Sequence, residues 1–232
     1  MSERTVSQSG PAGEGRAGGP VTVFLPTRAD RLPGQLADWI DDRTPGRQRI
    51  GVDADPSWGG ESLADEVADE LRRRGRPTIR ASTRWWWRAA ALRLEYGHTD
   101  PISLRRGWVD TAALRRELLD PLRPDGSGRH LRRLRDPATD RSVREPSEQA
   151  GENTVVVLDG PFLADLDLGL DAVIGLRVSA ATVRRSLPPE RAWWAPVLIG
   201  YLTDPRRAVA AAVEVAADHW DAPAVRWSSS RG

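Results

Sequence analysis

Apolar side chains recur along the chain at two spacings, which separate predicted helices from predicted strands. Leu63, Val67 and Leu71 recur at the helical interval, so residues 62–74 are predicted to form an amphipathic helix that ends before Gly75. Apolar spacing also predicts helices at 32–42 and 111–119. The continuous apolar run at 154–159 is typical of a buried parallel strand. Shorter apolar runs predict strands at 49–53, 78–81 and 172–178.

The remaining segments set the limits of the predicted domain. Residues 180–207 are predicted to be helical with proline interruptions, and 209–217 could be either a helix or a last strand. Residues 123–150 are polar and are predicted to form a long connection. Residues 1–20 and 228–232 are predicted to be a disordered leader and a disordered tail. The alternation of strands and helices between them predicts one α/β domain over 21–227, with a parallel sheet flanked by helices on both faces.

Composition excludes several kinds of chemistry. All 34 basic residues are arginine, there is no cysteine, and the only methionine is Met1. The chain therefore has no lysine for a Schiff base and no thiolate for catalysis or metal binding. A GC-rich genome would explain the arginine-only usage. A net charge of +1 gives no case for nucleic acid or an anionic membrane, and no apolar run approaches the ~20 residues of a membrane span. We expect a cytoplasmic protein.

A resemblance becomes visible at the turn after the first predicted strand, residues 51–62. Further matches follow in order at 63–67, 73–77, 108–114, 119–122, 135–141 and 157–163. In order and spacing these segments are similar to the P-loop nucleoside kinases of the uridine kinase type, over roughly residues 30–227. The resemblance implies a P-loop NTPase-like sheet, with ATP and Mg²⁺ used to phosphorylate a nucleoside.

The chain departs from that family where phosphate chemistry takes place. In an ungapped alignment the first glycine of the P-loop becomes Ala54, its lysine becomes Gly60, and its metal-binding hydroxyl becomes Glu61. The position of the family's catalytic aspartate is occupied by Arg84, which cannot act as a base at neutral pH. We therefore expect that ATP is not used and that no cofactor is required, although the sequence leaves Mg²⁺ open.

Tryptophan is concentrated in the segments that line the substrate and phosphate sites of this family. Ten tryptophans stand against two phenylalanines and two tyrosines. Indole faces favour flat apolar groups and organic cations. We expect a cavity of roughly a few hundred Å³ enclosed by these side chains. The alternatives are that they fill the space of a missing nucleotide or form a partner interface. The predicted ligand-binding tryptophans are Trp58, Trp85, Trp86, Trp87, Trp108, Trp193 and Trp194.

Acidic and basic side chains supply the remaining candidates. Asp53 and Asp159 end predicted strands and Glu61 begins a helix, so each could be a catalytic acid or base, or only a turn or helix cap. Arg132 and Arg133, like Arg84, could bind an anionic group of the ligand, or could lie in an exposed loop. The acidic set at 65, 66, 69 and 70 resembles a magnesium motif of terpene cyclases, but a solvated helix face explains it better. The three histidines show no metal-ligand spacing, so we predict no metal site.

Three functions remain open from the sequence. The favoured hypothesis is a repurposed enzyme that acts without phosphoryl transfer on an apolar or cationic small molecule, by cyclisation or isomerisation through a carbocation. The second is a pseudokinase that binds a partner through an exposed tryptophan surface and can form oligomers. The third is a residual ATP-dependent uridine kinase.

Overall fold

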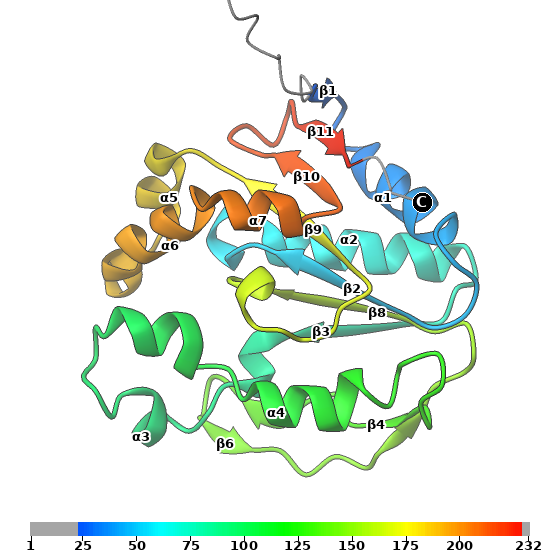
Figure 1. Cartoon of the computed structure of the whole chain (residues 1–232), viewed down its shortest axis with the longest axis horizontal. Coiled ribbons are helices and arrows are strands. Elements are labelled where there is room, and N and C mark those ends of the chain that lie inside the picture. Colours follow the sequence, from blue (N-terminus) through cyan, green and yellow to red (C-terminus); the bar gives the residue numbers. More distant parts are fainter. Residues whose placement is uncertain (1–22, 229–232) are drawn as a thin grey trace, which may run out of the picture.

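A seven-stranded sheet forms the centre of the computed structural model, which describes residues 23–228 (Figure 1). The strand order is β1-β11-β10-β9-β2-β8-β3. The strands from β10 to β3 are parallel, and β11 runs antiparallel to both of its neighbours. The strands are β1 (Leu25–Pro26), β2 (Gln48–Asp53), β3 (Thr78–Ser82), β8 (Val155–Gly160), β9 (Ala172–Arg177), β10 (Val213–Ala216) and β11 (Ala224–Trp227).

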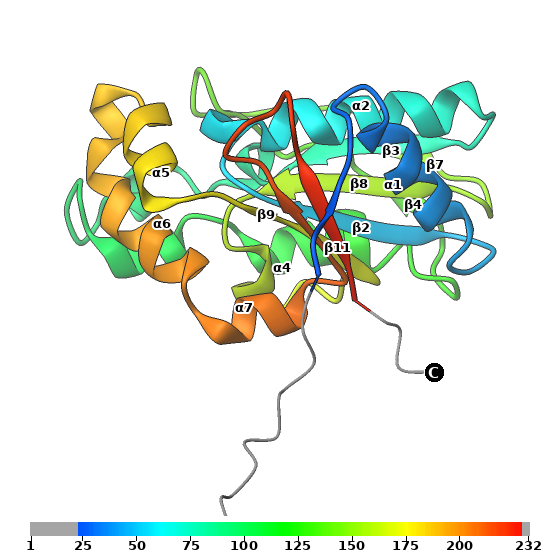
Figure 2. The same cartoon turned by 90° about the horizontal axis from the view of Figure 1, so that it is seen from above.

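Helices cover both faces of this sheet, as predicted (Figure 2). Alternate side chains of β8 show the division. Val155 and Val157 pack in one core with α1 and α2, whereas Val156 and Leu158 pack in a second core with the α4 region. The α-helices are α1 (Leu32–Asp41), α2 (Gly60–Arg73), α3 (Ala90–Arg93), α4 (Thr111–Leu114), α5 (Ala180–Ser186), α6 (Ala195–Leu202) and α7 (Pro205–Ala210).

Short helical segments connect the sheet to these helices. Three of them follow the carboxyl ends of strands β2, β3 and β8, and η6 precedes α6. The 3₁₀ segments are η1 (Pro56–Trp58), η2 (Thr83–Trp86), η5 (Leu163–Asp165) and η6 (Pro189–Trp194), and the π-helical segments are η3 (Ser103–Gly107) and η4 (Arg115–Leu119).

The structure confirms the fold class and corrects several boundaries. The ambiguous stretch 209–217 holds the end of helix α7 and then strand β10. Strand β11 was not predicted. The predicted connection 123–150 contains two small sheets, which pair β4 (Arg129–His130) with β7 (Glu148–Gln149) and β5 (Arg135–Asp136) with β6 (Arg141–Ser142). The predicted leader, and the predicted tail after Ser228, lie outside the described residues. No helix within 23–228 is long and apolar enough to cross a bilayer.

Candidate functional site

The candidate residues gather at the carboxyl ends of β2, β8 and β3, the edge where open parallel α/β sheets bind ligands (Figure 1). Asp53 is the last residue of β2, and Asp159 lies beside it on β8 in the register Val52 to Asp159. The β2–α2 turn (residues 54–59), η2 and η6 complete this edge. These strand ends lie together because the carboxyl ends of neighbouring parallel strands meet at one edge of the sheet.

The β2–α2 turn is held closed by its own side chains and by η6. Asp55 is fully buried, and its Oδ1 accepts hydrogen bonds from the Ser57 amide at 2.9 Å and the Ser57 hydroxyl at 2.5 Å. Arg191 of η6 reaches into the turn, with its Nη1 3.1 Å from Asp55 Oδ2 and its Nη2 3.0 Å from Ser57 Oγ. The turn therefore contains an internal anion, the Asp55 carboxylate, already paired with an arginine.

Backbone glycines let neighbouring groups approach this turn closely. Gly59 has a φ of +92°, and a Cβ there would lie 2.5 Å from the ring of Trp220, whose Nε1 donates to the Trp58 carbonyl at 3.0 Å. At Gly60 a Cβ would lie only 2.6 Å from the Cβ of Ala54. The methyl group of Ala54 therefore occupies the space into which a side chain at position 60 would begin.

Asp53 lies in a buried network that links β2 to the helices after β9. Tyr201 donates to its Oδ2 at 2.6 Å, Arg207 Nε donates to the same oxygen at 3.1 Å, and the Leu163 amide donates to Oδ1 at 3.1 Å. Burial raises the pKa of Asp53, and the positive charge of Arg207 opposes that rise. Both oxygens are engaged and the residue is 1% exposed, so its contacts are those of a structural link.

Asp159 and Glu61 are each paired with an arginine. Asp159 is fully buried, and its Oδ1 lies 2.7 Å from Arg80 Nη1, an ion-pair distance without the angle of a hydrogen bond. Burial raises the pKa of Asp159, and Arg80 offsets part of that rise. Glu61 pairs with Arg84 across the start of α2. Each of these two carboxylates is thus paired with a guanidinium group.

Four of the predicted tryptophans form one cluster. Trp87, Trp108, Trp193 and Trp194 meet at centroid distances of 5.1–6.4 Å, mostly edge to face. The guanidinium group of Arg93 lies 4.9 Å from the Trp87 ring and 4.8 Å from the Trp108 ring. We call these four residues the tryptophan cluster. Indole faces prefer the edges of other aromatic rings and cations. In this cluster the neighbouring tryptophans and Arg93 of the same chain supply both.

The other three predicted tryptophans lie apart from this cluster. Trp58 is buried in the core with α1 and α2, Trp86 is fully buried in the other core, and Trp85 packs beside it. The cavity beside the cluster, lined by Trp87, Trp108 and Trp194 among others, has a volume of only about 10 Å³. The expected large cavity enclosed by Trp58 and Trp85–87 is therefore wrong: the rings fill the space. No tryptophan within residues 23–228 is exposed, so the alternative of an exposed tryptophan surface is wrong as well.

The remaining charged candidates do not join the site. Arg132 and Arg133 form ion pairs with Glu148 and Glu145 near the small sheets, and about half of each arginine side chain is exposed.

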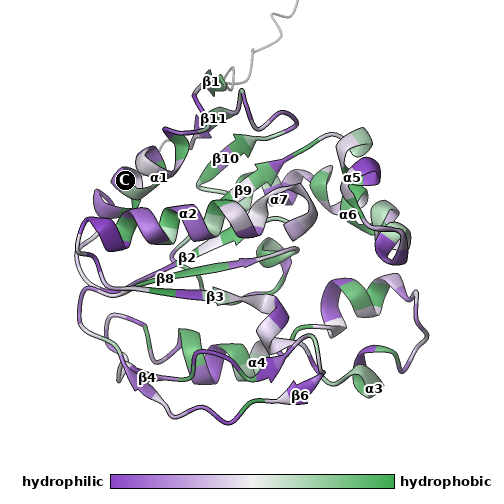
Figure 3. Cartoon of the chain, turned by 180° about the vertical axis from the view of Figure 1, so that it is seen from behind, coloured by the Kyte–Doolittle hydropathy of each residue, from purple (hydrophilic) through white to green (hydrophobic). Residues whose placement is uncertain are grey.

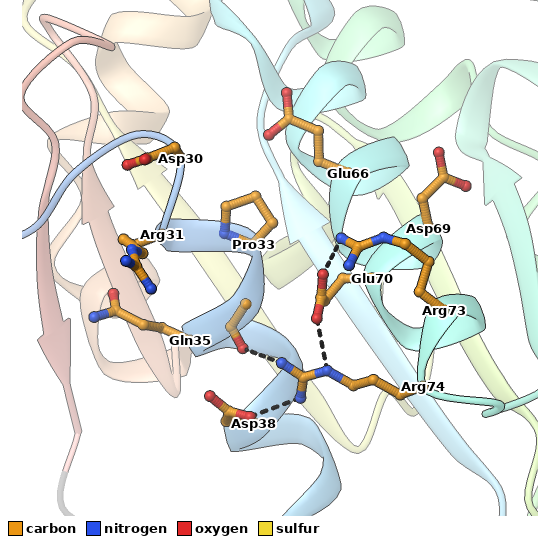
Figure 4. A pocket seen from close by; sticks show the side chains of 11 residues that line it. Asp30, Arg31, Pro33, Gln35, Asp38, Glu66, Asp69, Glu70, Arg73 and Arg74 are labelled. Carbon is orange, nitrogen blue, oxygen red and sulfur yellow. Dashed lines mark hydrogen bonds and ion pairs between the residues drawn. The ribbon is translucent and has the colours of Figure 1, made fainter.

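The acidic set on α2 borders a groove of about 690 Å³ between α1 and α2 (Figure 4). There Arg74 binds Glu70 and Asp38, each at 2.7 Å, and Arg73 also binds Glu70. The predicted solvated face fits this arrangement. Within residues 23–228 no group of three or more acidic or histidine side chains is placed to hold a metal ion.

Sequence reasoning missed the arginines that close the site. Arg191 and Arg207 come from segments far along the chain, and nothing in their local sequence marks them. Asp55 did carry a local signal, because Asp-Pro-Ser is a favourable start for a capped turn. Arg80 sits within the strand pattern, where an arginine near a buried carboxylate could have been considered.

Sheet order, site position and helix arrangement together define a P-loop kinase fold of the uridine kinase type. Solved structures support this assignment. A possible uridine kinase from Bacillus stearothermophilus superposes with a TM-score of 0.60 at 19% identity, over 78% of this chain and 94% of that one. A proposed fructose transport system kinase from Silicibacter sp. TM1040 gives a TM-score of 0.56 at 21% identity, over 78% and 95%. No protein-family model matches the sequence, and no curated protein matches it.

Proposed function

We propose that this chain uses the kinase fold without ATP-dependent phosphoryl transfer, and that it acts on an apolar or cationic small molecule. The observation that carries the proposal is the contact of Arg191 with Asp55 and Ser57 inside the β2–α2 turn. In the kinase fold this turn is the place for nucleotide phosphates. Here the carboxylate of Asp55 forms an ion pair with Arg191, the arginine that a bound phosphate would need.

Electrostatics at the turn support the same conclusion. A phosphate oxygen at ~4 Å from a carboxylate is repelled by about 4 kcal/mol per pair of unit charges at an effective dielectric constant of about 20. Asp55 and Glu61 both stand at this turn, and each already engages the arginine next to it, Arg191 and Arg84, so that neither guanidinium group is free for a phosphate. Gly60, at the lysine position, has its side-chain space taken by Ala54.

The residues present do not fit a magnesium–nucleotide complex. Magnesium prefers carboxylate and water oxygens in an octahedral arrangement. Arg80 already pairs with Asp159 on β8, and Arg84 with Glu61 at the start of α2. We therefore derive no step through Mg²⁺ or ATP.

The tryptophan cluster supports the choice of ligand class. It already holds the guanidinium group of Arg93 between two indole rings, an arrangement that an organic cation or a flat apolar group could replace. Because the cavity there is about 10 Å³, a ligand requires η6, which carries Trp193 and Trp194, to move outward. A cyclase- or isomerase-type reaction stays a prediction from the sequence.

Isothermal titration of the full chain with ATP and Mg²⁺ tests the first part of the proposal. We expect no binding at millimolar ATP and no transfer of phosphate to uridine. Mass spectrometry of small molecules that co-purify with the protein tests the second part, and we expect an apolar or cationic compound. Saturable ATP binding with phosphorylation of a nucleoside would overturn the proposal.

An ATP-dependent kinase is the second candidate, favoured by the likeness of the whole fold to the possible uridine kinase. It requires Arg191 to leave Asp55 and bind phosphate. Under that alternative, Asp55→Asn should strengthen ATP binding by removing the competing carboxylate. Under our proposal the variant binds no ATP either, so one titration of both proteins separates the two functions.

A further inference from the structure

An open groove lies between α6 and the segment that leads into η3. Its volume is about 610 Å³, within the range of small-molecule sites. Pro101 and Ile102 line one side, and Pro196, Val197 and Gly200 of α6 line the other. In Figure 1 these elements face each other at the end of the molecule where α5 and α6 lie, and in Figure 3 the α6 ribbon is largely hydrophobic.

The apolar lining of this groove is exposed to water. Ile102 is 71% exposed, one of the few large apolar side chains in residues 23–228 left so open. Helix α6 has the sequence APVLIGYL, with no charged residue on any face. Ala195, Leu198 and Tyr201 are buried in the core, and Val197, Ile199 and Leu202 are partly buried against it, whereas Pro196 and Gly200 are exposed. A helix that is apolar all round but covered on one face leaves an uncovered apolar strip, which marks a binding surface.

The charge of the groove is of one sign. Its lining includes Arg105 and Arg106 and no carboxylate. Arg105 is held by Asp165 at 2.5 Å and lies over the Tyr201 ring, and it also lines the small cavity of the tryptophan cluster. Arg106 is exposed, and its guanidinium group makes no hydrogen bond or ion pair with any residue of 23–228. A free guanidinium group at the rim of an apolar groove is suited to a ligand that has an apolar chain with an anionic group at one end.

We propose that this groove binds a small amphipathic anion, with its apolar body along α6 and its carboxylate or similar group on Arg106. The groove is separate from the β2–α2 turn, so this site does not depend on whether the chain uses ATP. Arg105 forms the wall between the groove and the tryptophan cluster.

Gly200 offers a direct way to block the groove. A Cβ at Gly200 would meet no atom within 4 Å, and Gly200 lines the groove, so the side chain of Gly200→Leu starts in open space and extends into the groove. The matched control is Gly34→Leu in α1, another helical glycine, whose Cβ would meet only the flexible end of Arg74 at 3.8 Å. Arg106→Gln removes the charge at the rim and keeps the apolar lining.

Isothermal titration with decanoate and with decyltrimethylammonium, below micelle-forming concentrations, tests the proposal on the full chain. We expect the wild type to bind decanoate more tightly than the cation of equal chain length. Gly200→Leu should weaken decanoate binding ~10-fold or more, and Arg106→Gln ~3- to 5-fold, while Gly34→Leu should match the wild type. Absence of decanoate binding, equal affinity for the two probes, or unchanged binding by Gly200→Leu would each overturn the proposal.

Discussion

Adding a single methyl group at Gly60 should destabilise this protein, although the same change stabilises most helices. Glycine inside a helix costs about 0.5–1 kcal/mol relative to alanine, so Gly→Ala at an open helical position is favourable. Gly60 begins α2, but a Cβ there would lie 2.6 Å from Ala54 Cβ and 3.2 Å from the Ala54 carbonyl oxygen. Neither neighbour is the end of a flexible side chain, so the backbone of the turn must shift.

The size of the effect follows from these contacts. Overpacking a well-filled core by one carbon costs about 1–3 kcal/mol, and this outweighs the gain in helix propensity. We expect Gly60→Ala to lower the free energy of unfolding by about 1–2 kcal/mol. In the open position on α6, Gly200→Ala should raise it by up to about 1 kcal/mol.

Urea unfolding followed by intrinsic fluorescence measures both changes, and a double-mutant cycle identifies the contact. Ala54→Gly removes the methyl group that a Cβ at position 60 would meet. Ala54→Gly/Gly60→Ala should therefore be less destabilised than the sum of the single variants by about 1 kcal/mol or more. Stabilisation by Gly60→Ala, or strict additivity in the cycle, would refute the steric argument.

Four further variants test the buried and charged contacts in urea unfolding. Asp53→Asn should cost about 3–5 kcal/mol because it breaks the buried pair with Arg207, whereas Arg206→Gln, at the protein surface, should cost much less; equal losses would contradict the buried link. Hydrogen bonds from Arg206 lower the pKa of Asp204 to about 2, so Asp204 stabilises the fold above its ordinary pKa of 3.8, and this contribution is lost as pH falls towards 2. The difference in free energy of unfolding between wild type and Asp204→Asn should shrink as pH falls from about 4 to 2. A constant difference would show that the Asp204 carboxylate does not stabilise the fold. Trp108→Ala should cost about 3–5 kcal/mol, since Trp108 contacts three other rings of its cluster, and a loss below about 1 kcal/mol would show that the cluster contributes little.

The parts of the fold that follow from local pattern were predictable. The apolar runs of β2, β8 and β9 and the helical periodicity of α2 are strong, and the topology of parallel sheets then brings the strand ends that carry Asp53 and Asp159 to one edge, with the two side chains on opposite faces. Strand β11 escaped prediction because it is only four residues long and mixes apolar and polar residues. Its pairing with β10 comes from tertiary context, which a local pattern does not contain.

The roles of the site residues depended on partners that lie far away in sequence. Asp53 looked like a catalytic group until Arg207, 154 positions later, was placed on it. Trp85, Trp86 and Trp87 looked like one aromatic wall, but they are on or beside a 3₁₀ turn. Successive residues of such a turn point in directions about 120° apart, so the three rings enter different environments. The sequence showed which segments carry the tryptophans, but it did not show the direction in which each ring points.

The close fit of Ala54 against Gly60 also limits how this chain could change by mutation. A glycine codon cannot become a lysine codon by one base substitution, and the shortest routes pass through arginine or glutamate. Each of these intermediates has a Cβ, and the Cβ meets the same methyl group at 2.6 Å. A side chain at position 60 is therefore better tolerated once that methyl group is lost. The effect of one substitution depends on the other, so the order in which the two positions change affects the stability of the intermediates.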